Sequence, residues 1–166
     1  DAARRDSVTG LPNRAAFLER AAELRESQGP DGRVALAVLD LDHFRWLEET
    51  WGRQFADGVL HRAGTRLTMA LRQAAVLARW DGAEFMALFV GRTAAEAGAL
   101  VDQARTVLRR VDFRSGGDTP VTLSFSAGVV DLPANLPIEE GLAQADRLRH
   151  IAKASGRDRV VAGEPT

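Results

Sequence analysis

Two short, continuous apolar runs constrain the fold of this chain most. Residues 34–39 read Val-Ala-Leu-Ala-Val-Leu and residues 85–90 read Phe-Met-Ala-Leu-Phe-Val, with no polar residue in either run. A strand with one face in water alternates apolar and polar residues, whereas a strand covered on both faces is apolar throughout. Both runs are therefore predicted to be central strands of a sheet that carries helices on its two faces.

Composition narrows the class of protein further. The chain has 166 residues, of which 45% are apolar and 27% charged, and this balance is typical of one globular domain over residues 1–166. Neither apolar run approaches the roughly 20 residues needed to cross a bilayer. The net charge of -1 provides no general attraction for nucleic acid or anionic lipid, so any phosphate binding must be local. The absence of cysteine is typical of a reducing compartment, and we expect a soluble, cytoplasmic segment.

The remaining elements follow from apolar spacing and turn residues. The pair Asp81-Gly82 separates two apolar runs and predicts a β-hairpin that turns at this pair. Three- and four-residue apolar spacing predicts helices between the strands, and a last helix over residues 138–154. The predicted strands are residues 34–39, 76–80, 83–90, 121–130 and 159–161. This order predicts an α/β (α+β) fold with a mixed sheet rather than a doubly wound parallel sheet.

The strongest candidate for chemistry is a pair of carboxylates at the end of the first apolar run. Asp40 and Asp42 follow residues 34–39 and precede a predicted helix. Strand ends are where α/β folds place their sites, and strand alternation puts both carboxylates on the same side. There they could hold a magnesium ion that carries a nucleoside triphosphate. The alternative for Asp42 is a helix cap, which would not explain Asp40.

Four motifs, in order along the chain, resemble those of GGDEF domains, the diguanylate cyclases that condense two GTP molecules into cyclic di-GMP. They are residues 6–14 (Asp-Ser-Val-Thr-Gly-Leu-Pro-Asn-Arg), 39–44 (Leu-Asp-Leu-Asp-His-Phe), 79–85 (Arg-Trp-Asp-Gly-Ala-Glu-Phe) and 152–160 (Ala-Lys-Ala-Ser-Gly-Arg-Asp-Arg-Val). The resemblance spans nearly the whole chain and implies the nucleotidyl-cyclase fold, a five-stranded mixed sheet surrounded by helices. That fold agrees with the predicted order of elements.

The resemblance also implies roles for individual residues. Asp40 and the Leu41 carbonyl match the metal ligands of the family, and Asp57 matches an acid that binds guanine. Lys153 and Arg157 match phosphate contacts, and Mg²⁺ with GTP is the implied cofactor. An alternative for the two basic residues is that they complement the dipole of a helix in its last turn. Asp57 taken alone would pass for a surface acid.

The hairpin motif departs from the family pattern at two positions. Active members read Gly-Gly-acid-Glu-Phe, whereas this chain reads Asp81, Gly82, Ala83, Glu84, Phe85. Ala83 replaces an acidic metal ligand, and a methyl group neither coordinates magnesium nor takes a proton. Asp81 replaces a glycine and adds bulk and negative charge next to the phosphates. No intact catalytic site is therefore expected in the hairpin.

Two further departures concern ligand recognition. Glu48 stands where most cyclases have an asparagine that contacts guanine, and its carboxylate can still accept hydrogen bonds from guanine N1–H and N2–H. The alternative is a solvated side chain beside Glu49. Family members with product inhibition carry Arg-x-x-Asp before the hairpin, whereas here Arg72 is followed by Ala75 at the acidic position. We therefore expect the allosteric product site at Arg72 to be degenerate.

These residues support three hypotheses about function. The first is a degenerate, catalytically inactive GGDEF domain that acts as a regulatory, GTP-sensing or dimerisation module in cyclic di-GMP signalling. Such a domain would be excised from a longer protein with attached signalling domains, for example a cyclic di-GMP phosphodiesterase domain. The second is an active cyclase in which Asp81 replaces the lost acid, although a tight turn interrupts strand alternation there. The third is a protein-interaction scaffold that binds no nucleotide. Expected partners are GTP or cyclic di-GMP and a second copy of the chain, without nucleic acid or membrane contact.

Overall fold

The structure is a computed structural model that describes residues 2–114 and 119–163. Its elements, in chain order, are η1 (Ala2–Arg4), α1 (Arg14–Gln28), β1 (Val34–Leu41), α2 (Phe44–Trp51), α3 (Arg53–Ala70), β2 (Val76–Asp81), β3 (Glu84–Val90), α4 (Ala94–Arg109), β4 (Phe125–Asp131), α5 (Ile138–Ala154) and β5 (Arg159–Ala162). In the described part of the chain, no helix combines the length and the apolar character needed to span a membrane.

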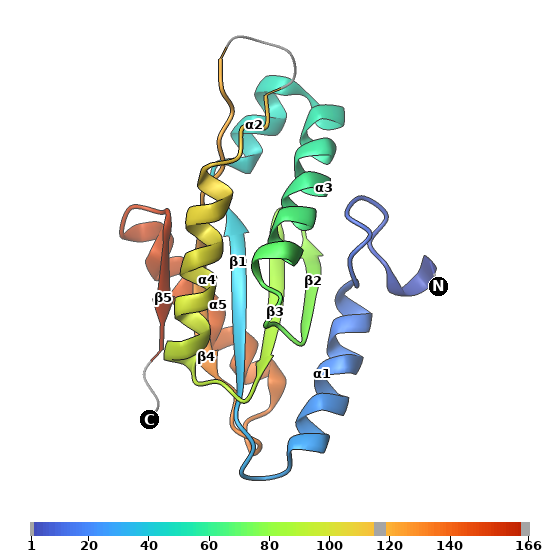
Figure 1. The fold of residues 1–166 in the computed structure, drawn as a ribbon, viewed down its shortest axis with the longest axis vertical. Coiled ribbons are helices and arrows are strands. Elements are labelled where there is room, and N and C mark those ends of the chain that lie inside the picture. The colour runs from blue at the N-terminus through green and yellow to red at the C-terminus, as the bar shows by residue number, and fades with distance from the viewer. Residues whose placement is uncertain (1, 115–118, 164–166) are drawn as a thin grey trace.

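The strands form one mixed, five-stranded sheet in the order β2-β3-β1-β4-β5, as Figure 1 shows. Strand β1 pairs antiparallel with both β3 and β4, and β2 pairs antiparallel with β3. Only β5 runs parallel to its neighbour, β4. The two apolar runs form β1 and β3, which both have a neighbour on each side. Their prediction as central strands is confirmed, as is the five-stranded mixed sheet.

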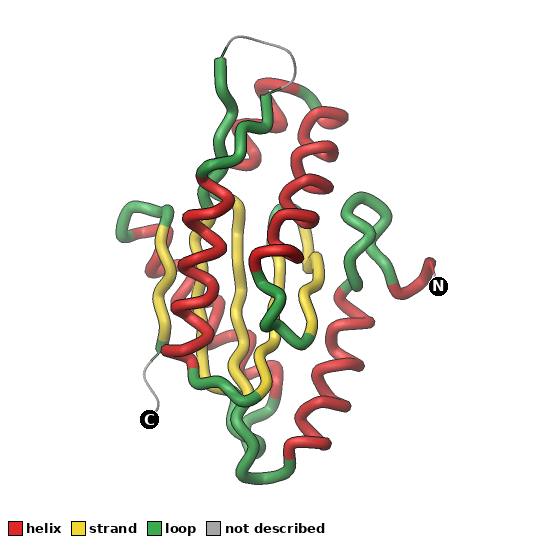
Figure 2. Tube along the Cα trace, in the orientation of Figure 1, coloured by secondary structure: helices red, strands yellow, loops and turns green. Residues whose placement is uncertain are grey.

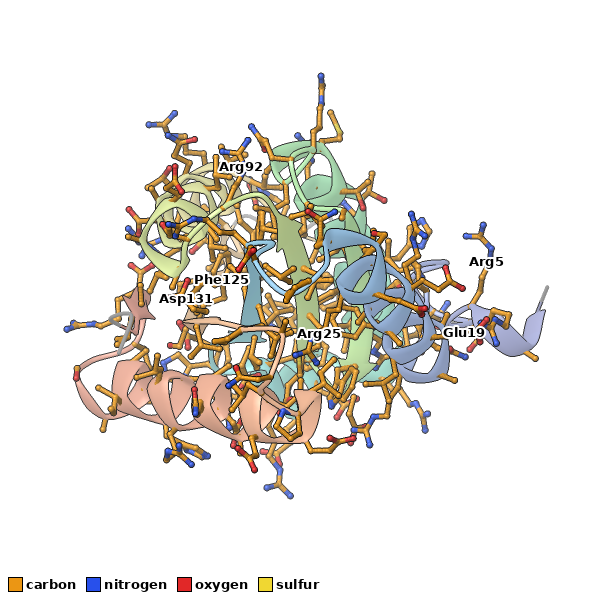
Figure 3. The ribbon with its side chains drawn as sticks, turned by 90° about the horizontal axis from the view of Figure 1, so that it is seen from below. Arg5, Glu19, Arg25, Arg92, Phe125 and Asp131 are labelled. Carbon is orange, nitrogen blue, oxygen red and sulfur yellow. The ribbon has the colours of Figure 1, made fainter. Side chains whose placement is uncertain are left out.

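Helices cover both faces of the sheet, which explains why β1 is apolar at successive positions. Ala35, Ala37 and Leu39 pack on the side of α3 and α4, whereas Leu36 and Val38 pack with residues of α1 and α5. Figure 2 shows the helices around the strands, and Figure 3, seen from below, places α4 and α5 on opposite sides of the sheet. Successive side chains of a strand point to opposite faces, so each face of β1 has its own apolar partners.

The hairpin turn lies one residue later than predicted. Asp81 is the last residue of β2 and pairs with Glu84, so the two residues of the turn are Gly82 and Ala83. Gly82 has a φ of 50°, which glycine adopts without the steric cost that a Cβ imposes. The prediction of a turn at Asp81-Gly82 is therefore wrong by one residue.

A bulge at Trp80 causes this shift. The register jumps between Arg79 and Asp81, which leaves Trp80 as an extra residue in β2. The Trp80 ring packs edge-on against Phe17 of α1, with the ring centroids 5.7 Å apart. The extra residue thus makes a tertiary contact with α1, which local sequence patterns do not report.

The fourth strand is shorter than predicted. The prediction covered residues 121–130, but β4 begins at Phe125. Its partner β1 ends with Leu41 opposite Phe125, and the Asp42 N–H donates to the Ser124 carbonyl at 2.9 Å before the chain turns into α2. Residues 121–124 therefore lie beyond the end of β1 and do not continue its strand pairing. The last helix, α5, has the predicted bounds.

Candidate functional site

A cleft of about 930 Å³ lies at the end of the sheet where β1 stops, the hairpin turns and α5 ends. This end is uppermost in Figure 1. The predicted site residues that line the cleft are Asp40, Leu41, Glu48, Asp57, Gly82, Ala83, Lys153 and Arg157. The predicted residues that are not among its described lining residues are Arg72, Asp81, Glu84 and Phe85. The structure thus brings together the predicted metal, guanine and phosphate positions, and leaves Asp81 outside them.

Asp42 is a buried carboxylate surrounded by hydrogen-bond donors. The hydroxyls of Ser124 and Ser126 donate to it at 2.6 and 2.7 Å, the Asp158 N–H donates at 3.0 Å, and Lys153 Nζ at 3.1 Å. Burial alone would raise the pKa of Asp42, but these bonds outweigh it and lower the pKa below the ordinary value of 3.8. Both oxygens of Asp42 are therefore committed to holding β4, α5 and the loop before β5 together.

The alternative that Asp42 caps a helix is wrong. The residue at the N-terminus of α2 is His43, with a left-handed φ of 57° and no side-chain cap. The expected placement of Asp40 and Asp42 on one side fits the structure, because Lys153 Nζ lies 3.2 Å from Asp40 Oδ2 and 3.1 Å from Asp42 Oδ1. Lys153 is in the last turn of α5, but its ammonium group contacts these two carboxylates.

Asp40 is also paired with a buried arginine that the sequence analysis did not select. Arg149 Nη1 lies 3.0 Å from Asp40 Oδ2, and Arg149 Nε lies 2.8 Å from Asp146 Oδ1. Directly opposite Asp40 on β3 is Glu84. Burial raises the pKa of Glu84, the charge of Arg149 opposes the rise, and the net pKa lies above the ordinary value.

These contacts do not fit a resident divalent metal ion. Magnesium prefers six oxygen ligands in near-octahedral geometry. Asp40 Oδ2 is held by two cations, both oxygens of Asp42 are occupied by donors, and Ala83 contributes no side-chain ligand. Within the described residues, no group of three or more His, Cys, Asp or Glu side chains could hold a metal. Asp40 Oδ1 and the Leu41 carbonyl are too few donors on their own.

The predicted guanine-binding residues lie at the end of the cleft formed by α2 and α3. Glu48 and Asp57 both line the cleft and are both half-buried. Glu49, by contrast, is exposed and lies 3.6 Å from Arg45. Glu48 is thus placed differently from the solvated acid next to it, and a carboxylate in this position can accept hydrogen bonds from a base edge.

Arg157, one of the two predicted phosphate contacts, lies in a tight loop between α5 and β5. Gly156, Arg157 and Asp158 have φ values of 123°, 64° and 50°. Non-glycine residues in this region cost of order 1 kcal/mol or more each, so the surroundings must hold them there. Asp158 is held by ion pairs to Arg105, at 2.7 Å, and to Arg109. Because α5 ends at Ala154, the helix-dipole alternative for Arg157 is wrong.

The hairpin is tied to the opening motif through Arg79, a contact that the sequence analysis missed. The Arg79 guanidinium donates to the Gly82 carbonyl at 3.0 and 2.6 Å and to Asp6 Oδ1 at 2.9 Å. Asp6 Oδ2 also accepts from Thr9 N–H and from its hydroxyl, both at 2.8 Å. Burial would raise the pKa of Asp6, but the Thr9 bonds and Arg79 lower it overall. The conformation of the opening motif and of the turn is thus fixed by one shared network.

The cleft has a local excess of positive charge. Its charged lining residues are the bases Arg45, Arg53, Arg79, Lys153 and Arg157 and the acids Asp40, Glu48 and Asp57. This excess exists within a chain of net charge -1. The cleft can therefore attract a polyphosphate locally, although the chain as a whole is nearly neutral.

Of the residues missed, only Arg149 carried a readable signal. The buried residues of α5 are Gly141, Ala145, Arg149 and Ala152, so Arg149 lies on the apolar stripe. A charged residue on such a stripe needs a buried partner. Ser124 and Ser126 carried no signal, because nothing in the sequence places them beside Asp42.

The predicted product site at Arg72 is separate from the cleft. Arg72 is exposed just beyond α3, and Ala75 is exposed as well. The Ala75 N–H donates to the Leu88 carbonyl at 2.7 Å, which fixes the backbone there.

Comparison with known sequences identifies diguanylate cyclases as relatives of this chain. The sequence model of the family described as "Diguanylate cyclase, GGDEF domain" matches residues 3–159. The diguanylate cyclase DgcP of Pseudomonas aeruginosa is 37% identical over 157 residues, which are 93% of this chain and 23% of DgcP. The diguanylate cyclase VdcA of Vibrio cholerae is 29% identical over 158 residues, 94% of this chain and 46% of VdcA.

Solved structures agree. The diguanylate cyclase SiaD of Pseudomonas aeruginosa, determined in complex with its activator SiaC, superposes with a TM-score of 0.88 at 34% identity, covering 95% of this chain and 60% of SiaD. The coiled coil and GGDEF domain of DgcB from Caulobacter crescentus, in complex with c-di-GMP, gives a TM-score of 0.88 at 25% identity, covering 98% and 86%. The chain spans between 20% and 46% of the length of DgcP, VdcA and three other curated relatives that it resembles.

Proposed function

Because the chain belongs to the GGDEF domain family of cyclic di-GMP signalling, we propose that it is a catalytically silent member that binds GTP in the cleft and acts as a regulatory domain. The cleft retains an acidic guanine end and a basic phosphate end. It lacks the acid that the family pattern places at position 83. Binding without turnover follows from this combination.

The observation that carries the proposal is the geometry of the hairpin. Ala83 lines the cleft and accepts a hydrogen bond from the Leu41 N–H through its carbonyl at 3.1 Å, so a methyl group stands at the expected ligand position. Asp81 is exposed, pairs with Glu84 and is absent from the described lining. This placement argues against the alternative in which Asp81 supplies the missing acid.

In this proposal, any magnesium arrives on the phosphates of GTP, which is the cofactor that the family resemblance implies. The domain works within a longer signalling protein, as the partial coverage of its relatives suggests. Its state, with or without GTP, would be transmitted to an attached domain, for example a cyclic di-GMP phosphodiesterase, or to a second copy of the chain. The site is cytoplasmic, where GTP is available.

Titration with GTP and magnesium tests the proposal. Calorimetry measures binding, and chromatography of the same mixture measures cyclic di-GMP. We expect saturable binding, no product, and loss of binding in Asp57→Ala, which removes the acid of the guanine end. Product that disappears in Asp40→Ala would establish an active cyclase instead. No binding by the folded wild type would establish the scaffold.

A further inference from the structure

Two carboxylates stand side by side on β1 and β3, and one of them, Asp40, lines the cleft. Asp40 on β1 and Glu84 on β3 are directly paired, and strand alternation puts them on the face that Val38 and Met86 share with α5. Like charges directly opposite one another on neighbouring strands are destabilising. Both side chains are partly buried, so water screens their repulsion only in part. A neighbouring cation relieves this repulsion.

The cation is supplied by α5. Arg149 is only 8% exposed, and its Nη1 lies 3.0 Å from Asp40 Oδ2. Its Nε is fixed at 2.8 Å from Asp146 Oδ1, and its charge also acts on Glu84. Lys153, one turn further along, adds a second contact to Asp40 at 3.2 Å. A guanidinium remains charged at all physiological pH values. Because it is part of the chain, it cannot dissociate from the site as a bound metal ion can.

We propose that Arg149 is a built-in cation that neutralises Asp40 and acts on Glu84, so that this carboxylate pair does not need a divalent metal ion. The positive charge that offsets the two carboxylates is therefore part of the chain. The domain does not depend on magnesium for its stability, and its carboxylates are not free to recruit the ion.

A consequence for the ligand follows, and this consequence rests on the proposed function. The phosphates of GTP would be held by side chains, chiefly Lys153, Arg157 and the other cleft arginines, rather than through a metal bridge. The cleft would then accept GTP without a divalent ion. The cleft would therefore bind free guanine nucleotide polyphosphates as well as their metal complexes.

The primary test measures thermal stability without nucleotide, in EDTA and in millimolar Mg²⁺ or Mn²⁺. The Tm of the wild type is expected to be the same in all three solutions. Arg149→Met keeps the packing of the stem but removes the charge, so its Tm in EDTA should fall by roughly 5–15 °C. Metal should restore a substantial part of that loss, because it can now occupy the vacated position.

A matched control lies on the same helix. Arg147→Met removes the same charge from an exposed position two residues away, and its Tm should respond to neither EDTA nor metal. Electron paramagnetic resonance of Mn²⁺ provides an independent readout. Arg149→Met should bind the ion, and the wild type and Arg147→Met should not.

Two further variants keep the test decisive if Arg149→Met does not fold. Arg149→Lys retains the charge and should remain insensitive to metal. Asp40→Asn combined with Arg149→Met removes one carboxylate together with the cation, so it should be more stable in EDTA than Arg149→Met and should not bind Mn²⁺. The proposal is overturned if the wild type gains stability from metal as the Met variant does, or if metal restores neither the stability nor the folding of Arg149→Met.

The nucleotide consequence has its own measurement. GTP affinity of the wild type in EDTA should lie within about threefold of its affinity in magnesium, whereas a metal-bridged site loses tenfold or more. Complete dependence on magnesium would overturn this consequence. If GTP binds in neither solution, the proposed function fails, while the stability and Mn²⁺ results still decide the role of Arg149.

Discussion

A methyl group at position 83 limits what the cleft can do with a bound nucleotide. Ala83 follows Gly82 in the turn, and its backbone carbonyl is bonded to the Leu41 N–H. A carboxylate introduced here would lie beside the Leu41 backbone and could share a metal with it and with the free oxygen of Asp40. The turn of the wild type therefore offers no side-chain ligand to a metal ion that a nucleotide carries into the cleft.

We predict that Ala83→Asp strengthens GTP binding in magnesium by about tenfold, equivalent to about 1.4 kcal/mol. The gain should vanish in EDTA, because it requires the ion. Asp81→Gly serves as the matched control and should change the affinity little, since Asp81 is exposed outside the cleft. The double variant Asp81→Gly with Ala83→Asp should behave like Ala83→Asp alone. Calorimetry measures the affinities, and circular dichroism checks folding.

Unchanged or weaker binding in a folded Ala83→Asp variant would mean that the cleft has lost nucleotide binding through other residues as well. The scaffold would then be the better account of this domain.

Asp42 links stability to pH at the level of a single residue. Its pKa is lowered in the folded state relative to 3.8, so it contributes stability above the unfolded value. That contribution is lost as pH falls through the lower, folded pKa. Acid unfolding should therefore include a component from Asp42 below about pH 4.

We predict that Asp42→Asn lowers the free energy of unfolding at pH 7 by about 2–4 kcal/mol, because it removes a charge that four donors surround. The loss should shrink as the pH falls below about 4 and through the lowered pKa of folded Asp42, because the wild-type carboxylate itself then becomes protonated. Urea unfolding at several pH values measures both effects. Glu49→Gln, at an exposed pair, should change neither. A loss that is the same at every pH would contradict the assigned charge.

The residue scale shows what sequence reasoning could and could not reach. Asp40 and Asp42 were accessible because strand alternation alone puts them on one side. The partners of Asp42 were not accessible, since Ser124 and Ser126 reach it only through the pairing of β4 with β1. Arg149 was accessible in principle from the apolar stripe of α5, yet the identity of its partner depends on the sheet register.

At the scale of elements, the hairpin and the opening motif behave as one unit through Arg79. Asp6 and the turn are connected by this one guanidinium, and both ionic partners are 16% exposed. A partly buried, charge-assisted pair of this kind is stronger than an exposed one. The opening motif therefore positions the hairpin as well as beginning the domain.

We predict a coupling of about 1–3 kcal/mol between Arg79→Ala and Asp6→Ala in a double-mutant cycle of unfolding free energies. Arg4 and Glu19 provide a matched control, since their side chains are 40% and 55% exposed, and their coupling should stay below about 1 kcal/mol. Arg79→Ala should also weaken GTP binding, because the turn that lines the cleft loses its tie. Equal coupling in the two cycles would show that Asp6 and Arg79 do not form a unit.

Element boundaries were predictable where the periodicity is long and local. Helix α5 matches its predicted bounds because seventeen residues of regular apolar spacing specify it. The hairpin turn and the start of β4 were misplaced because each is set by another element: Trp80 packs on Phe17 of α1, and β1 ends opposite Phe125. Tertiary contacts of this kind leave no trace in a local window.

At the scale of the whole molecule, two ligand sites on different parts of the surface are in question. The cleft has charges suited to GTP, whereas the predicted product site has Arg72 without the acidic partner of the family pattern. A diguanylate cyclase also has to bring two nucleotides together from two subunits, so the whole assembly matters for turnover. A domain that senses GTP needs only its own cleft. The chain keeps the cleft residues that GTP sensing needs, and it lacks the acid at position 83 that the family pattern places in the hairpin.

The product site can be tested by restoring its missing acceptor. Arg72 offers a guanidinium fork to a phosphate or a guanine edge, but Ala75 cannot accept a hydrogen bond through its side chain. Since Ala75 is exposed, Ala75→Asp introduces a carboxylate without a clash. We predict that the wild type binds cyclic di-GMP weakly or not at all, and that Ala75→Asp increases the affinity by about tenfold, or about 1.4 kcal/mol. Arg72→Ala in the Ala75→Asp background should abolish the gain.

Calorimetry with cyclic di-GMP, alone and in the presence of GTP, separates this site from the cleft, because GTP should not compete for it. Tight binding by the wild type that is lost in Arg72→Ala would show instead that another acceptor near Arg72 has replaced the acid, and product feedback would then be a property that this domain has kept.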